Sequence, residues 1–206
     1  MHARSTTFRG RPERLEAGIA VVRVEVLPAL RGMDGFVGLS LLVDRDSGAC
    51  IATTAWESEE AMRRTAPAVG RLRDRAEGVL GGRPEVREWE IAVLHRVRPV
   101  PPGACARVTW TRAVNTSIDE QLFAFRIGTL PQVEDLPGFC SASALVDRGT
   151  GRAAVAVVYD SPDRLARSRG PAGELRASAV EQLGAQVLDV AELEVAIAHL
   201  RVPATS

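Results

Sequence analysis

The chain contains no lysine: all 26 of its basic residues are arginine, in a sequence of 206 residues. Enzymes that form a Schiff base and P-loops that bind nucleotides both need the ε-amine of lysine, which a guanidinium group cannot replace. Net charge is also missing, because 26 acidic residues balance the arginines. Proteins that coat nucleic acid or an anionic membrane need a basic surface, so we expect neither nucleic acid nor a membrane as partner.

The sequence has no apolar run long enough to cross a membrane, and its start, MHARSTTFRG, lacks the apolar segment of a secretory signal. We therefore expect a cytoplasmic protein. Cysteine is scarce too, since Cys50, Cys105 and Cys140 are odd in number and form no C-x-x-C pair. This pattern is typical of buried thiols in a reducing compartment and not of a disulfide framework.

Two copies of one pattern make up the chain. Residues 3–81 align without a gap with residues 106–184 and share far more identities with them than composition alone would give. In the clearest part, RGMDGFVGLSLLVDRDSG (31–48) lies over EDLPGFCSASALVDRGTG (134–151). The Pro-rich segment RPVPPG separates the copies. We therefore predict a first repeat at 1–97, a linker at 98–104 and a second repeat at 105–203.

Each copy predicts the element order strand, helix, strand, strand, helix, strand. We expect Pro28 and Pro131 to end the first helix, because proline disrupts a helix interior. A turn of the type D-x-x-(S/T)-G joins the second strand to the third. Prolines and glycines inside the second helix indicate that it is broken or preceded by a loop. Alternation in the fourth strand of the first copy predicts one shared face for Trp89, Ile91, Val93 and His95.

This α+β order is the ferredoxin-like βαββαβ plan, in which one copy alone would leave a sheet face bare. The Gly-Phe entry to the second strand, the D-x-x-(S/T)-G turn and the run TTAWESEEA (53–61) resemble the dimeric α/β-barrel superfamily, and most closely its antibiotic-biosynthesis-monooxygenase-like branch. The resemblance implies two tandem repeats packed sheet to sheet as an intrachain barrel. The chain is then a pseudo-dimer by itself, with further oligomerisation left open.

The resemblance also implies a function. It suggests a small apolar or aromatic molecule bound in a cleft between helices and sheet, with a cofactor-independent monooxygenase as the reaction type. The alternative is a non-enzymatic structural or interaction module, in which duplication serves stability alone. The fold does not decide between enzyme and module, and it does not identify a substrate.

Aromatic residues and histidines supply the candidates for the pocket. Oxygenases of the resembling family often have a Trp lining the cleft at the end of the third strand, where this chain has Trp56 in copy one and Tyr159 in copy two. The structural alternative is that these side chains are core or strand-end residues. Because copy one has Trp56 and Trp89 where copy two has Tyr159 and Leu193, we expect any single functional cleft in copy one. The candidates are Trp56, Tyr159, Trp89, Trp110, His95 and His199.

We expect no cofactor and no metal. Haem-degrading relatives ligate iron through a His in the second helix, whereas residues 62–69 and 165–172 contain none. His95 or His199 would be the remaining haem ligand, as a third functional alternative. Neither histidine has the convergent partners that a metal site needs. The only asparagine, Asn115, is placed to cap a helix rather than to line a cleft.

Arginines at matching positions in the two copies are the candidates for anion contacts, since a guanidinium can donate two hydrogen bonds to a carboxylate or a phosphate. The alternative is an ion pair with a neighbouring acid or a solvated side chain. The candidate pairs are Arg4 with Arg107 and Arg23 with Arg126.

Overall fold

The structure, a computed structural model, describes residues 1–114 and 116–200, so the predicted cap at Asn115 lies outside the described residues. The chain divides into two compact units. Among the described residues, unit 1 comprises Met1–Trp89 together with residues 194–200, and unit 2 comprises Glu90–Leu193. These units differ from the two sequence repeats at one point, because the fourth strand of each repeat leaves the unit in which it begins. The repeat and linker boundaries themselves stay a prediction.

Each unit has the predicted element order. Unit 1 contains β1 (His2–Arg9), a 3-10 turn (Pro12–Arg14), α1 (Leu15–Val21), a π-helical turn (Val22–Val26), α2 (Leu27–Arg31), β2 (Phe36–Val43), β3 (Ala49–Trp56), α3 (Glu59–Arg64), α4 (Ala66–Leu80) and the start of β4 (Glu85–Arg96). Unit 2 contains the rest of β4, β5 (Cys105–Ala113), α5 (Ile118–Ala124), a π-helical turn (Phe125–Thr129), α6 (Leu130–Glu134), β6 (Phe139–Asp147), β7 (Arg152–Tyr159), α7 (Pro162–Arg167), α8 (Arg169–Leu183) and the first part of β8 (Ala185–Leu200).

Both sheets are antiparallel and have the same internal order. In unit 1, β3 lies between β1 and β2, and β2 also pairs with the second part of β8. In unit 2, β7 lies between β5 and β6, and β6 pairs with the second part of β4. The hydrogen-bonded order β1-β3-β2-β8-β5-β7-β6-β4 closes into a barrel. The α+β barrel class predicted from the sequence is therefore confirmed.

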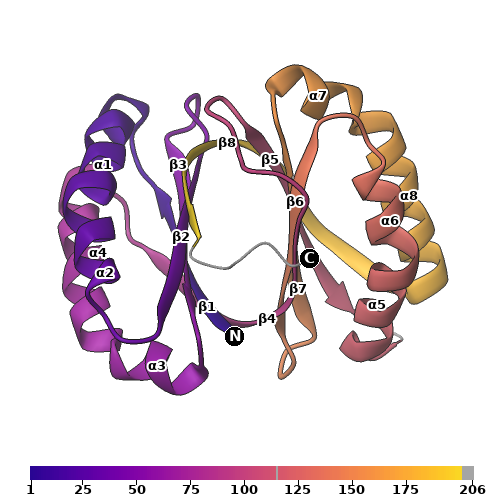
Figure 1. Ribbon diagram of the computed structural model, residues 1–206, viewed down its shortest axis with the longest axis horizontal. Coiled ribbons are helices and arrows are strands. Elements are labelled where there is room, and N and C mark those ends of the chain that lie inside the picture. The colour runs from indigo at the N-terminus through magenta and orange to yellow at the C-terminus, as the bar shows by residue number, and fades with distance from the viewer. Residues whose placement is uncertain (115, 201–206) are drawn as a thin grey trace. The chain divides into compact units, whose positions relative to one another are not determined.

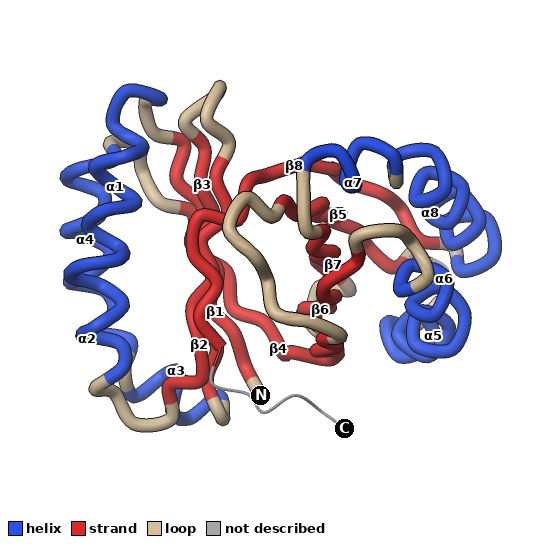
Figure 2. The backbone as a smooth tube through the Cα atoms, turned by 45° about the horizontal axis from the view of Figure 1, so that its top comes forward, coloured by secondary structure: helices blue, strands red, loops and turns tan. Residues whose placement is uncertain are grey.

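Helices cover one face of the sheet in each unit. In unit 1 these are α1, α2 and α4, and in unit 2 they are α5, α6 and α8 (Figure 1). Figure 2 shows the same helix layer for each unit from another direction. Each unit therefore has a space between helices and sheet that side chains either fill or leave open.

The first helix of each unit does not end at its proline. In unit 1, α1, the π-helical turn and α2 follow one another without a break, and Pro28 lies in the first turn of α2. In an α-helix a proline ring clashes with the carbonyl four residues earlier, and the wider π turn relieves that clash. Unit 2 repeats this solution before Pro131 in α6. The prediction that these prolines end the helix is therefore wrong.

The strand β4 changes faces along its length. Its pairing with β6 shifts between Ile91 and Val93, and such a bulge reverses which face the following residues occupy. Trp89 donates from its indole nitrogen to the hydroxyl of Ser5 at 2.8 Å, on the sheet face away from the helices. Val93 instead packs in the core under the helices. The prediction that Trp89, Ile91, Val93 and His95 share one face is therefore wrong, and β8 has a matching shift.

All three cysteines are reduced and buried, as the sequence predicts. Burial raises the pKa of the Cys50 thiol to about 11, and it also raises the pKa of Cys140. A thiol attacks a disulfide reagent only after losing its proton, so we expect the native protein to leave Ellman's reagent unreacted for minutes at pH 8. Unfolding in guanidinium should release all three thiols. A fast reaction of one thiol in the native protein would contradict this expectation.

Candidate functional site

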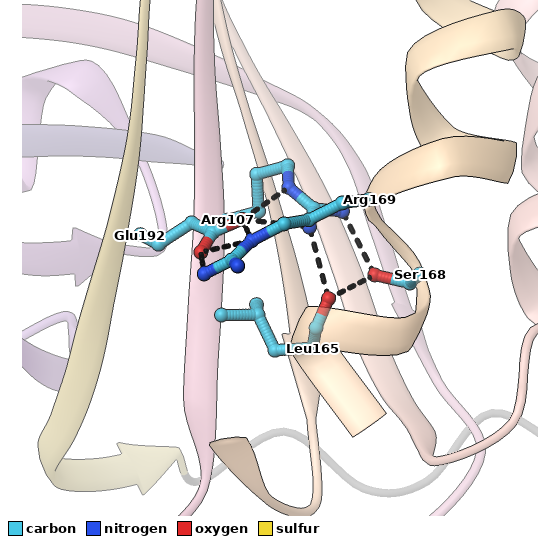
Figure 3. A network of polar contacts seen from close by, with 5 residues as sticks. All are labelled: Arg107, Leu165, Ser168, Arg169 and Glu192. Atoms are coloured by element: carbon cyan, nitrogen blue, oxygen red, sulfur yellow. Dashed lines mark hydrogen bonds and ion pairs between the residues drawn. The ribbon is translucent and has the colours of Figure 1, made fainter. Parts of the chain in front are cut away.

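A buried arginine holds the second helical segment against the first strand in each unit. In unit 2, Arg107 is 4% exposed and donates from Nε and Nη2 to one carboxylate oxygen of Glu192, at 3.2 and 2.8 Å. Its Nη1 donates to the hydroxyl of Ser168 at 2.9 Å, and Nη2 donates to the backbone oxygen of Leu165 at 3.0 Å (Figure 3). The guanidinium is therefore engaged by protein groups on several sides.

Glu192 has two cationic partners. Arg169 donates to both of its oxygens, at distances from 2.6 to 3.1 Å (Figure 3). Hydrogen bonds from Arg169, and then from Arg107, hold the pKa of Glu192 below its ordinary value. The carboxylate is thus charged at neutral pH and compensates the buried guanidinium. Without that compensation, burial of the positive charge would lower the stability of the folded protein.

Unit 1 has a matching arrangement. Arg4, 5% exposed, donates from Nε and Nη2 to Glu88 at 3.1 and 2.7 Å, and from Nη2 to the backbone oxygen of Met62 at 3.2 Å. The ion pair with a neighbouring acid, which the sequence left as the alternative for Arg4 and Arg107, is what the structure has at both positions. The sequence reasoning missed both glutamates. Their signal was available, since Glu88 and Glu192 lie at equal distances before the matching segments 90–95 and 194–199.

Unit 2 has a cavity between its helices and its sheet that is partly open to the surface. Its volume is about 140 Å³, and most of its lining is apolar. The strands contribute Arg107, Thr109, Thr111, Ala144, Ala153, Val155, Val157, Tyr159 and Ala185, and the helical segments contribute Ile118, Gln121, Leu122, Phe125, Thr129, Val133, Ala172, Leu175, Arg176 and Ala179. Such a concave, mainly apolar space with a few polar groups is typical of a small-molecule site.

Smaller side chains in the second copy account for the cavity. The aligned positions in unit 1 hold Phe8 and Leu41, which are 3% and 2% exposed, where unit 2 has Thr111 and Ala144. In unit 1 these residues belong to one continuous apolar cluster that includes Trp56. In unit 2 the buried apolar residues form several separate clusters, and members of three of them line the cavity. The lost side-chain volume was therefore not recovered by collapse of the core.

Two polar residues of β5, Arg107 and Thr111, mark the length of the cavity. Arg107 pairs in register with Val157, and four residues further along β5 Thr111 pairs with Ala153. At about 3.3 Å per residue these two pairs lie about 13 Å apart along the strands. The ring of Tyr159 lies 5.8 Å from the guanidinium carbon of Arg107, so the aromatic hydroxyl side chain and the buried cation share one end of the cavity.

The tryptophans named from the sequence lie away from this cavity. Trp56 is fully buried in the core of unit 1, where its indole nitrogen donates to the hydroxyl of Thr54 at 3.1 Å and its ring packs edge-on against Phe36. Trp89 lies on the sheet face away from the helices. Trp110 alternates with the cavity-lining residues Thr109 and Thr111 and so also faces away from the cavity. Of the six aromatic and histidine candidates, Tyr159 lines the cavity.

The two histidines of the fourth strands lie near helix ends. His95 shares a hydrogen bond of 2.9 Å with Glu134 and packs near Phe139. His199 contacts the guanidinium of Arg31 at 3.3 Å and stacks on Phe36. Neither histidine belongs to the cavity lining. Among the residues that the structure describes, no group of three histidines, cysteines or acids is arranged to hold a metal ion.

Arg23 and Arg126 come from the π-helical turns and cap strand bulges. Arg23 donates to the backbone oxygen of Ala196 at 3.3 Å, and Arg126 donates to that of Ala92. Both alanines lie where the strand pairing shifts, so their carbonyls need a partner outside the regular ladder. The functional cleft expected in copy one stays a prediction, and the cavity described above lies in unit 2.

No helix within residues 1–114 and 116–200 is both long and apolar enough to span a membrane. No protein-family model matches the chain. A protein of Mycobacterium tuberculosis, "Uncharacterized protein Rv2558", is 52% identical over 204 residues, which are 98% of this chain and 86% of that protein.

Two solved structures show the same fold. One, an anthrone oxidase-like protein, superposes with a TM-score of 0.69 at 16% identity and covers 100% of this chain and 95% of its own. The other, a ferredoxin fold protein of Listeria monocytogenes related to antibiotic biosynthesis monooxygenases, gives a TM-score of 0.53 at 10% identity over 94% of each chain. The chain therefore has the dimeric α/β-barrel fold of the antibiotic-biosynthesis-monooxygenase-like proteins, and it belongs to the same family as the mycobacterial protein Rv2558.

Proposed function

We propose that this protein binds a small, mainly apolar or aromatic molecule in the cavity of unit 2. The observation that carries the proposal is the cavity itself, with a volume of about 140 Å³, an apolar lining and a polar end at Arg107 and Tyr159. An engineered apolar cavity of roughly 150 Å³ in another protein binds benzene, so one ring with a short substituent has a suitable size. The second copy keeps the fold while leaving this space unfilled, which supports a use for it.

Binding is tested with a panel of one-ring and two-ring aromatic compounds, followed by calorimetry of the complete chain. A ligand of this site is expected to raise the free energy of unfolding by about 2.7 kcal/mol at a concentration a hundred times its dissociation constant. Heat of binding and thermal shift are better readouts than tryptophan fluorescence, since Trp110 faces away from the cavity. A panel that gives neither heat nor thermal shift would contradict the proposal.

The reaction suggested by the resemblance is oxygenation without a cofactor, and one solved structure of this fold is described as anthrone oxidase-like. In that chemistry the bound substrate must itself donate electrons to O₂. Ligands found by calorimetry are therefore tested in an oxygen electrode, with heat-denatured protein as control. Oxygen uptake that depends on native protein supports the oxygenase, whereas binding without uptake supports the non-enzymatic module.

A cytoplasmic location and a lack of nucleic acid and membrane partners remain proposals from the sequence.

A further inference from the structure

The guanidinium of Arg176 lies in the cavity wall, and the packing of the fold does not explain it. Arg176 lies on α8, is half-buried and lines the cavity. Burial, followed by the positive charge of Arg107, lowers the pKa of Arg176 below its ordinary value. The side chain therefore carries its charge in surroundings that do not favour it.

Arg176 lacks a local acidic partner. The residues three and four positions away on the same helix are Ala172, Gly173, Ala179 and Val180, so the helix offers no acid at the spacing of an ion pair. Within the described part of the chain no hydrogen bond or ion pair joins Arg176 to another side chain. The acid whose charge acts on it, Glu192, already receives hydrogen bonds from Arg107 and Arg169.

The local charges do not balance at this end of the cavity. Three guanidinium groups, those of Arg107, Arg169 and Arg176, share the single carboxylate of Glu192. An anion bound there would reduce this surplus of positive charge. In water such a surplus is screened by counterions, but the half-buried wall of an apolar cavity screens it less.

Unit 1 has one guanidinium group fewer at the matching place. The position aligned with Arg169 is Ala66, whereas Arg176 has a counterpart in Arg73 on α4. Unit 1 also fills the corresponding space with Phe8 and Leu41. The larger surplus of guanidinium groups thus occurs in the unit with the cavity, while the arginine at position 73 or 176 is common to both units.

We propose that the ligand of the cavity is an apolar carboxylic acid in its ionised form, with the carboxylate held by the guanidinium of Arg176 and the apolar body enclosed by the cavity. The planar guanidinium donates two parallel hydrogen bonds to a carboxylate, which suits this group better than a neutral polar group. Tyr159 lines the same end of the cavity and can donate from its hydroxyl. This inference rests on the proposed function and narrows its ligand class.

The experiment compares two probes of nearly equal shape, 4-ethylbenzoate and the neutral 4-ethylbenzamide, by isothermal titration calorimetry at pH 7 on the complete chain. We expect the acid to bind at least about tenfold more tightly than the amide, as a charge-assisted hydrogen bond allows. The variant Arg176→Gln should lose that preference and leave amide binding unchanged. The matched variant Arg73→Gln should keep the wild-type preference.

The outcomes separate this inference from the proposed function. If both probes bind equally, or if Arg176→Gln retains the preference for the acid, the anion inference is overturned while binding in the cavity stands. If neither probe binds while neutral compounds of the aromatic panel do, the anion inference is overturned and the proposed function stands; if no compound of the panel binds either, both are overturned. Circular dichroism and the melting temperature of each variant establish that a lost preference does not come from unfolding.

Discussion

Replacing Glu192 by glutamine is expected to lower the free energy of unfolding by about 2 to 3 kcal/mol at pH 7. The reason is the partner left behind, since Arg107 is 4% exposed and would keep its charge without a carboxylate. Glu192 itself is 25% exposed, which places the expected loss below that of a fully buried pair. Denaturant unfolding at equilibrium measures the change.

The double variant Arg107→Met with Glu192→Gln tests this cause. Because Arg107→Met removes the charge that Glu192→Gln leaves uncompensated, we expect the double variant to cost clearly less than the sum of the two single variants. The exposed Glu181, replaced by glutamine, serves as control and should change stability by less than about 0.5 kcal/mol. Additive losses in the double variant would show that Glu192 does not act by compensating Arg107.

The effect of Glu192 should also depend on pH. Its pKa in the folded protein is lowered from an ordinary value of 4.5, so the stabilisation is fully present above that value. It is lost as the pH falls through the lower, folded pKa, because protonation then removes the charge. The difference between the wild type and Glu192→Gln should therefore shrink as the pH falls below 4.5. A difference that stays constant down to pH 3 would contradict the charge argument.

The element order could be predicted from the sequence because it depends on local signals that occur twice. Ser58 and Ser161 each cap the following helix, and Asp44 and Asp147 each accept hydrogen bonds within their turns, as the paired motifs indicated. The continuation past Pro28 could not be predicted, because it depends on a π turn that leaves no clear sequence signal. The bulge in β4 is hidden in the same way, since it lies in the apolar run Ile91 to Leu94, where residue type does not distinguish one sheet face from the other.

The location of the cavity was harder to predict for a different reason. Aromatic side chains drew attention to copy one, yet Trp56 fills space there instead of lining it. The informative positions were those where the second copy has lost volume, Thr111 against Phe8 and Ala144 against Leu41. Volume lost from a core leaves a cavity only if the surroundings do not close in, and this depends on tertiary packing that one sequence does not reveal.

Exchanging residues between the copies at this point gives the second large expected effect. The change Ala144→Leu places in unit 2 the side chain that Leu41 has in unit 1, and it should reduce binding in the cavity by at least about tenfold because the ligand and the new side chain compete for one space. Filling an existing void in an apolar wall is also expected to raise the free energy of unfolding, by about 1 kcal/mol. Calorimetry with the ligands found for the wild type measures the first effect and denaturant unfolding the second.

The reverse change, Leu41→Ala, supplies the matched control. Leu41 is 2% exposed within the continuous core of unit 1, so its truncation should cost about 3 kcal/mol of stability and leave binding in unit 2 unchanged. The two variants therefore separate stability from binding. Ala144→Leu is expected to raise stability and lower ligand affinity, whereas Leu41→Ala is expected to lower stability and leave ligand affinity unchanged. If Ala144→Leu kept full affinity, the ligand would have to bind elsewhere. If Leu41→Ala cost nothing, Leu41 would not be tightly packed in unit 1, and the explanation of the cavity in unit 2 by the smaller Ala144 would fail.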